Sequence, residues 1–322
     1  MKGKERVFPA HPPWIFFKNF IEQEDRFNAL QYVLRASGIV YSIVQTGAVN
    51  PASHLFVSPA KTDVCNATAA SSAEIKPADE KKTRPMDAKA AVVLAAHYDK
   101  VSGSPGANDN AASIFILIET IQKLLASGAE NWLVIFTDKE ELSENDGLRD
   151  QGAYQLALKL KCGPLGNARF FIFDCCGRGD TVIISTTAGH LLKTENGAGR
   201  IHLQKNLLNL RQTAIKKAAE AMLERCLLLP TPFSDDAGFL MAGAAAQLIT
   251  VLPSREASEF SSLTRRNPIY INSLVNRKLK KRRDQSLFPQ TWRIVNTPED
   301  VEESLNPEHF AAMVKFAVAL CK

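Results

Sequence analysis

The sequence predicts a single α/β domain in which a mixed, mostly parallel sheet lies between layers of helices. One observation leads to this fold class, and two others exclude a disordered chain and a membrane-spanning helix. Short apolar runs of strand length alternate with segments whose apolar residues recur at helical spacing. The composition, 45% hydrophobic and 23% charged in 322 residues, is that of a globular protein. No apolar run reaches the roughly 18 residues that a membrane-spanning helix needs.

The N-terminal part is expected to form a helix followed by a hairpin. Residues 13–37 carry apolar side chains at helical spacing, whereas residues 40–46 and 54–59 alternate or cluster as strands do. Glycine, asparagine and proline lie between the two strand-like segments, as they do in turns. From 60 to 88 the sequence becomes small and polar, so a long loop insertion is expected there.

From residue 91 onwards, strands and helices are expected to alternate. The expected strands cover residues 91–96, 132–137, 168–174, 181–185 and 246–252. The expected helices cover residues 111–125, 151–160, 207–228 and 307–320. Such an order indicates parallel strands joined by helical crossovers. Residues 255–290 fit no element and are predicted to be a second loop insertion.

The excess of positive over negative charge comes from one short segment. The net charge is +5, but six basic residues lie within residues 277–283 (RKLKKRR), so the remainder carries one net negative charge. The chain is therefore not expected to bind nucleic acid over its whole surface. The basic run alone could bind nucleic acid or anionic lipid, but a solvated loop is the favoured interpretation, and no membrane partner is expected. The six cysteines show no CxxC spacing, and the basic start of the chain lacks the apolar core of a secretion signal. We expect reduced thiols and a cytoplasmic location.

Chemically useful polar residues gather where three expected strands end. They are His97 and Asp99 after 91–96, Asp109 in the following loop, Glu140 and Glu141 after 132–137, and Asp174 at the end of 168–174. Taken alone, each has an ordinary explanation as a hydrogen-bonded pair, a helix cap or a solvated helix start. At the carboxyl ends of neighbouring strands, however, they would meet in one crevice. So much negative charge in one place calls for a cation.

A zinc ion suits this set of residues. Zinc accepts imidazole nitrogen and carboxylate oxygen, and a catalytic zinc needs three protein ligands and a water. Asp99 could orient the His97 ring from behind, as carboxylates do for zinc-bound imidazoles, so we place it with the catalytic residues. One residue of the pair Glu140 and Glu141 could bind metal while the other removes a proton from water.

Six segments of the chain resemble the co-catalytic zinc exopeptidases, which include bacterial leucyl aminopeptidases, glutamate carboxypeptidase II and the glutaminyl cyclases. They are AHYDK (96–100), PGANDNAAS (105–113), FTDKEEL (136–142), FFIFD (170–174), FSDDAGF (233–239) and NTPED (296–300). They occur in the family's order and span roughly residue 91 to the end. The resemblance implies one α/β domain built around zinc, as in the zinc aminopeptidases.

The resemblance also implies a role for each residue by its position. His97, Asp109 and Asp174 would bind the first zinc, and Asp109 would bridge to a second. Glu141 resembles a ligand of the second zinc. Glu140 resembles the general base.

One position departs from the family's pattern. The family's last ligand is a histidine in a pattern like HTxxD, where this sequence has Asn296, with Asp300 four residues on. A neutral amide oxygen is a poor zinc ligand beside imidazole. We therefore expect one tightly bound zinc ion, a second position that is weak or empty, and Asn296 as a doubtful ligand. His309 is the nearest other histidine in the sequence that could take the missing role.

The predicted function is that of a zinc-dependent aminopeptidase that removes N-terminal residues from peptide or aminoacyl substrates by a metal-activated water. Two alternatives remain open. The chain could be a degenerate family member that acts by binding, which the loss of the last histidine would suit. It could also be a glutaminyl-cyclase-like acyltransferase, although the single zinc of that branch resembles the second site and uses the late histidine. The sequence leaves the preferred side chain and the oligomeric state open.

Overall fold

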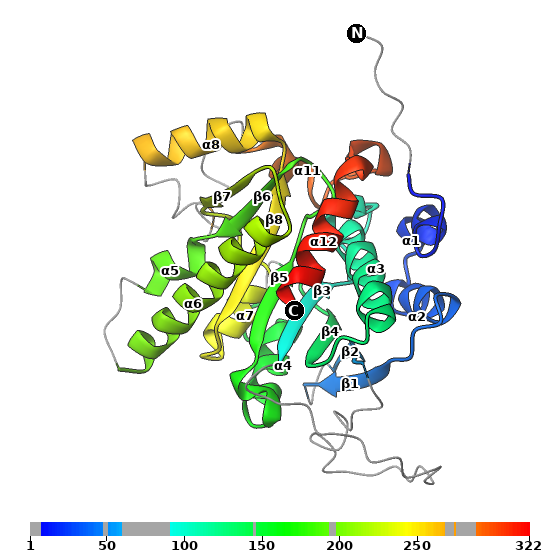
Figure 1. Cartoon of the computed structure of the whole chain (residues 1–322), viewed down its shortest axis with the longest axis horizontal. Coiled ribbons are helices and arrows are strands. Elements are labelled where there is room, and N and C mark those ends of the chain that lie inside the picture. The colour runs from blue at the N-terminus through cyan, green and yellow to red at the C-terminus, as the bar shows by residue number, and fades with distance from the viewer. Residues whose placement is uncertain are drawn as a thin grey trace.

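The centre of the molecule is an eight-stranded sheet with the strand order β1-β2-β4-β3-β5-β8-β6-β7, covered by helices on both faces (Figure 1). The computed structural model describes residues 8–47, 51–59, 91–143, 146–192, 198–267, 274 and 288–322. The predicted fold class, a single α/β domain with a mixed, mostly parallel sheet, is confirmed. The predicted loop at 60–88 and the basic run at 277–283 lie outside the described residues.

The strands at the centre of the sheet are parallel to one another. The strands are β1 (Ser42–Thr46), β2 (Ala52–Val57), β3 (Val92–His97), β4 (Trp132–Thr137), β5 (Arg169–Phe173), β6 (Thr181–Ser185), β7 (Cys226–Leu229) and β8 (Ala246–Leu252). Strand β3 pairs in parallel with β4 and β5, and β5 pairs in parallel with β8. Because these strands are buried on both faces, their sequences are continuous apolar runs. The predicted hairpin is confirmed, since β1 and β2 are antiparallel.

Two helical layers cover the sheet. The α-helices are α1 (Phe17–Glu22), α2 (Arg26–Ala36), α3 (Ala112–Ala126), α4 (Gly152–Lys161), α5 (Thr187–Leu192), α6 (Ala198–Glu220), α7 (Asp235–Met241), α8 (Ser254–Arg266), α11 (Gln290–Ile294) and α12 (Phe310–Leu320). Helices α3, α6 and α12 share one hydrophobic core with the N-terminal helices, while α4 and α7 share the core of the opposite face. Figure 1 shows α3 and α12 packed side by side. Among the described residues, no helix combines the length and the apolar character needed to cross a membrane.

The predicted N-terminal helix is interrupted. The 3-10 turn Trp14–Phe16 leads into α1, which ends at Glu22, and α2 begins anew at Arg26. The carboxylate of Asp25 caps this new start by accepting the N–H of Asn28 at 3.0 Å. The helical spacing of residues 13–37 thus predicts helix correctly, but it does not reveal the break at Asp25, which caps α2.

The predicted helix over 207–228 is wrong at both ends. Helix α6 begins at Ala198 and ends at Glu220, and the residues Cys226–Leu229 form β7. Met222 has a positive φ of 55°, which breaks the helix. The leucines beyond it are drawn into the sheet by parallel pairing with β6, which is a long-range contact that local spacing does not reveal.

The predicted loop insertion at 255–290 is wrong over its first part, because α8 occupies Ser254–Arg266. Only Ala257, Phe260 and Thr264 of this helix are buried, and its other residues are mainly polar or charged. This narrow apolar stripe explains why the segment was not recognised as a helix. Of residues 268–287, the structure describes Leu274 alone.

Candidate active site

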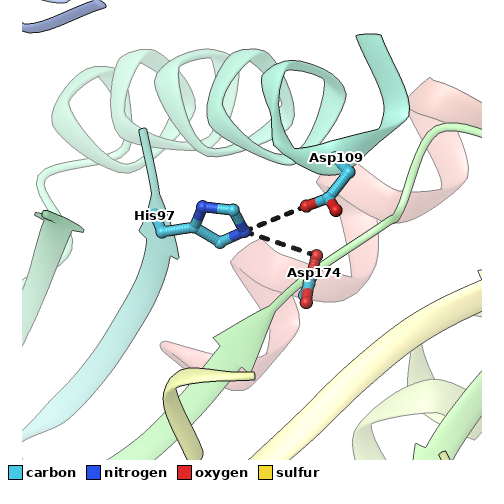
Figure 2. A group of neighbouring side chains, drawn as sticks. All are labelled: His97, Asp109 and Asp174. Atoms are coloured by element: carbon cyan, nitrogen blue, oxygen red, sulfur yellow. Dashed lines mark ion pairs between the residues drawn. The ribbon is translucent and has the colours of Figure 1, made fainter. Parts of the chain in front are cut away.

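The predicted site residues meet at the carboxyl ends of β3, β4 and β5. His97 is the last residue of β3, and Asp174 follows the last residue of β5. Asp109 lies in the short turn Ala107–Ala111, which leads into α3 and has non-helical backbone angles at Asp109 itself. Parallel strands end at the same edge of a sheet, so these three side chains face one another (Figure 2).

The geometry of this group suits one metal ion. The Nε2 atom of His97 lies 3.1 Å from Oδ1 of Asp109 and 3.7 Å from Oδ1 of Asp174. One ligand atom from each residue falls within 4.8 Å of the others. His97 is 0% exposed, and both its Nε2 and Oδ1 of Asp174 are buried without a hydrogen-bond partner. Buried polar atoms normally have hydrogen-bond partners, so two such atoms that converge with a carboxylate oxygen of Asp109 fit a zinc ion.

Asp99 holds the His97 ring from behind. Its carboxylate Oδ1 lies 3.4 Å from Nδ1 of His97, and its backbone carbonyl lies 3.2 Å from the same nitrogen. The same carboxylate accepts the backbone N–H groups of Glu140 at 3.2 Å and Glu141 at 2.9 Å. Asp99 thus links the loop after β3 to the loop after β4, which suits the orienting role that was predicted for it.

Charges in the site shift the pKa values strongly. Burial opposes protonation of His97, but the adjacent carboxylates of Asp109, Asp174 and Asp99 raise its pKa well above the usual value. Burial raises the pKa of Asp109, and the charge of Asp174 adds to this effect. Burial also tends to raise the pKa values of Asp174 and Asp99. The contact of each carboxylate with His97 outweighs burial, so both pKa values are lowered.

The two adjacent glutamates lie in the same negative field. Burial raises the pKa of Glu140 well above its usual value, opposed by His97 and assisted by the charge of Glu141. Burial, and next the charge of Asp109, raise the pKa of Glu141 to about 8. Carboxyl groups crowded in this way are costly to ionise together unless a cation lies between them.

Asn296, the doubtful ligand expected from the NTPED segment, contacts Glu141. It follows α11 on a turn and has a positive φ of 62°, a conformation that asparagine adopts more readily than most residues. Its Nδ2 donates a hydrogen bond to Oε2 of Glu141 at 3.0 Å. His309, the suspected substitute, closes a 3-10 turn ahead of α12 and is not part of the metal-ligating group found among the described residues.

A second metal position beside Glu141 does not fit the residues present. The partner that should complete it, Asn296, is neutral and presents an N–H rather than an oxygen to the carboxylate. The NH₂ group of an amide has no lone pair available for a metal, and amides are weak ligands for zinc beside imidazole. The donor set therefore suits one metal at His97, Asp109 and Asp174.

Asp300 is a site residue for which sequence reasoning gave no role beyond the alignment. Its carboxylate accepts the backbone N–H groups of Asn108 at 2.9 Å and Asp109 at 3.0 Å. Its backbone carbonyl accepts the N–H of Ala107 at 3.1 Å. Three contacts from one residue thus fix the turn that carries Asp109. The sequence feature that could have pointed to Asp300 is its position four residues after Asn296 in the NTPED segment.

Two asparagines of the PGANDNAAS segment tie this turn to the end of β5. Asn110 donates to the carbonyl of Phe173 at 2.9 Å and accepts the N–H of Cys175 at 3.2 Å. Asn108 accepts the N–H of Gly177 at 2.9 Å. These contacts set Asp109 and Asp174 relative to each other, because each asparagine joins the two loops that carry them.

Two further aspartates, from the segment FSDDAGF, lie buried at the start of α7. Asp235 is 0% exposed and accepts a short hydrogen bond from Oγ1 of Thr137, and Asp236 is 1% exposed and accepts the N–H of Ser234 at 2.9 Å. Burial raises the pKa of Asp235 to about 7 and that of Asp236 to about 8. The segment FSDDAGF is part of the family resemblance, but no role was predicted for either aspartate.

A family model covers most of the chain. Residues 79–317 match the family described as peptidase family M28. None of the functionally curated proteins compared with the chain is significantly similar to it.

Several solved structures share the fold at low sequence identity. A zinc aminopeptidase from Bacillus subtilis is 17% identical, with a TM-score of 0.50, and the match covers 84% of this chain but 49% of that one. The LapA aminopeptidase of Legionella pneumophila is 14% identical, with a TM-score of 0.56 and coverage of 96% and 68%. A glutaminyl cyclase from Tannerella forsythia is 14% identical, with a TM-score of 0.57 and 98% coverage of both chains.

These three similarities concern the fold, and the chain spans only about half the length of the Bacillus enzyme. The match to the family model is of a different kind, because it extends over more than half of the chain and includes every residue of the candidate site. The chain belongs to peptidase family M28.

Proposed function

We propose that the chain is a zinc-dependent aminopeptidase-like hydrolase that removes N-terminal residues from peptide or aminoacyl substrates. The observation that carries this proposal is the convergence of His97, Asp109 and Asp174, with two buried ligand atoms among them that make no hydrogen bond. Membership of peptidase family M28 and the fold shared with aminopeptidases support it.

His97, Asp109 and Asp174 would hold the zinc ion. When bound, zinc polarises a carbonyl group and lowers the pKa of a coordinated water. Asp99 keeps Nε2 of His97 directed at the metal position by contacting the opposite ring nitrogen. Asp300 and the two loop asparagines fix the carboxylates on the other side.

Glu140 would act as the general base. Gln151 donates to its Oε1 at 3.3 Å, and Asp99 accepts its backbone N–H, so the side chain is held from two directions. A carboxylate with a raised pKa is a better proton acceptor near neutral pH than an ordinary glutamate. The proton that it takes from water can then pass from the Glu140 carboxyl to the leaving amine.

The proposal is tested by assaying the purified, zinc-loaded chain against a panel of aminoacyl-nitroanilides and short peptides. We expect hydrolysis that disappears on chelation and returns when zinc is added back. A zinc-loaded chain that hydrolyses no member of the panel would instead support the alternative of a family member that acts by binding.

A second candidate is a glutaminyl-cyclase-like acyltransferase. The observation in its favour is the mutual coverage of 98% with the Tannerella enzyme, since this chain spans only 49% of the Bacillus aminopeptidase. The loss of the last histidine at Asn296 speaks against it. Incubation with peptides that begin with glutamine decides the matter, because cyclisation would release ammonia and leave the rest of the peptide intact.

A further inference from the structure

The place where the second metal of the family pattern would lie is occupied by a side-chain pair. Asn296 donates from Nδ2 to Oε2 of Glu141, and the carbonyl oxygen of the amide is not used in this contact. Oε1 of Glu141 is buried and has no hydrogen-bond partner. The pair therefore offers a carboxylate oxygen that lacks a hydrogen bond.

An unpartnered carboxylate oxygen in a buried position is costly, and a charged donor would offset that cost. An ammonium group has three N–H donors, and its positive charge would balance the negative charge of the surrounding carboxylates. A zinc ion would need the Asn296 amide to turn its oxygen to the metal and would gain only a neutral ligand. Ammonium suits the pair better than zinc does.

The location of the pair also suits a substrate group that enters from solvent. Asn296 is exposed and Glu141 is half-buried, whereas His97 is fully buried. Two covalent bonds separate the α-nitrogen of a peptide from the carbonyl carbon of its first residue. An α-ammonium held at Glu141 would consequently bring that carbonyl close to the neighbouring Glu140.

We propose that Glu141 and Asn296 together replace the second metal and bind the free α-ammonium group of the substrate directly. This inference rests on the proposed function, because it names the group that makes the site selective for unblocked N-termini. Asn296 positions the Glu141 carboxylate by its hydrogen bond, and Glu141 carries the charge that recognises the ammonium.

The test measures binding without turnover. The zinc-loaded Glu140→Gln variant is titrated with L-leucine amide and with N-acetyl-L-leucine amide, and the alanine and phenylalanine pairs are measured in the same way. Each pair differs in whether the α-nitrogen is a charged ammonium or a neutral amide. We expect the free amine to bind at least about tenfold more tightly, as charge-assisted hydrogen bonds do.

Further substitutions in this background identify the residues responsible. Adding Glu141→Gln should abolish the preference for the free amine, and Asn296→Ala should reduce it, because it removes the N–H that positions the Glu141 carboxylate. The matched control is Glu299→Gln, an exposed carboxylate on the same turn, which should leave the preference unchanged. Zinc content is measured for every variant, so that a loss of metal is not mistaken for a loss of recognition.

Each outcome decides the inference separately from the proposed function. Equal binding of free and acetylated amides, binding of neither, or two tightly held zinc ions in the unmodified chain would overturn it, even if peptides are hydrolysed. A clear preference for the free amine that depends on Glu141 would uphold it, even if the unmodified chain hydrolyses nothing.

Discussion

The carboxylate of Asp300 accepts the backbone N–H of Asp109 at 3.0 Å, although 191 positions separate the two residues in the chain. The turn that brings Asn296 to Glu141 thus also carries Asp300, which holds the backbone of Asp109. Thr297 and Asp300 stabilise this turn by backbone hydrogen bonds, from Thr297 to Ile294 at 3.2 Å and from Asp300 to Thr297 at 3.2 Å. One C-terminal segment therefore supports both halves of the site.

Replacing Asp300 should weaken metal binding without removing a ligand. Asp300→Asn keeps the size of the side chain but loses the charge and one acceptor, so the turn that carries Asp109 would loosen. We expect zinc affinity to fall by about 10- to 100-fold, as for other residues that orient metal ligands. Competition with a chromogenic chelator measures this, and Glu299→Gln on the same turn is the control. Unchanged affinity would show that Asp109 is held by its other contacts alone.

Replacing Glu140 should separate metal binding from chemistry. Glu140→Gln preserves the shape and the contact with Gln151 but cannot accept a proton, so we expect the zinc content to be retained and kcat to fall by at least about 10²-fold. The drop is measured with the best substrate of the panel, and elemental analysis follows the zinc. Turnover at the original rate in this variant would exclude Glu140 as the base.

The number of metals should follow the residue at position 296. We expect one tightly held zinc ion in the unmodified chain, at His97, Asp109 and Asp174. Asn296→His supplies an imidazole next to Glu141 and should raise the stoichiometry towards two, because histidine tolerates the positive φ of this position and is a strong zinc ligand. Elemental analysis after gel filtration gives the answer. Two equally tight ions before the substitution would contradict the expectation.

The elements that the sequence predicted well are those whose patterns are local. The runs WLVIFT and TVIIS are strands with the expected bounds, because a strand buried on both faces must be apolar throughout. The position of Asn296 was also predictable, since its motif lies in a fixed order after the others. This prediction did not depend on the structure of the segment 255–290 that precedes the motif.

The elements that the sequence predicted poorly depend on distant partners. The leucines of β7 continue the apolar spacing of α6, and only their pairing with β6 makes them a strand. Asp300 is one acidic residue among several near the C-terminus until the fold brings it to Asp109. Asp235 likewise owes its position to Thr137 at the end of β4, and nothing in the local sequence signals this contact.

The buried Asp236 should make the stability of the metal-free chain depend on pH. Its pKa is raised to about 8 by burial, whereas an unfolded aspartate titrates near 3.9. Between these values the unfolded chain releases a proton that the folded chain retains, so rising pH favours unfolding, by up to about 1.4 kcal/mol for each pH unit from this group. Asp236→Asn cannot ionise and should flatten this dependence, so the variant should gain stability relative to the unmodified chain as the pH rises from 5 to 8. Urea unfolding at several pH values measures the difference. Parallel curves for the two proteins would mean that the folded state already ionises Asp236 at low pH, and that its buried carboxylate is compensated by a partner.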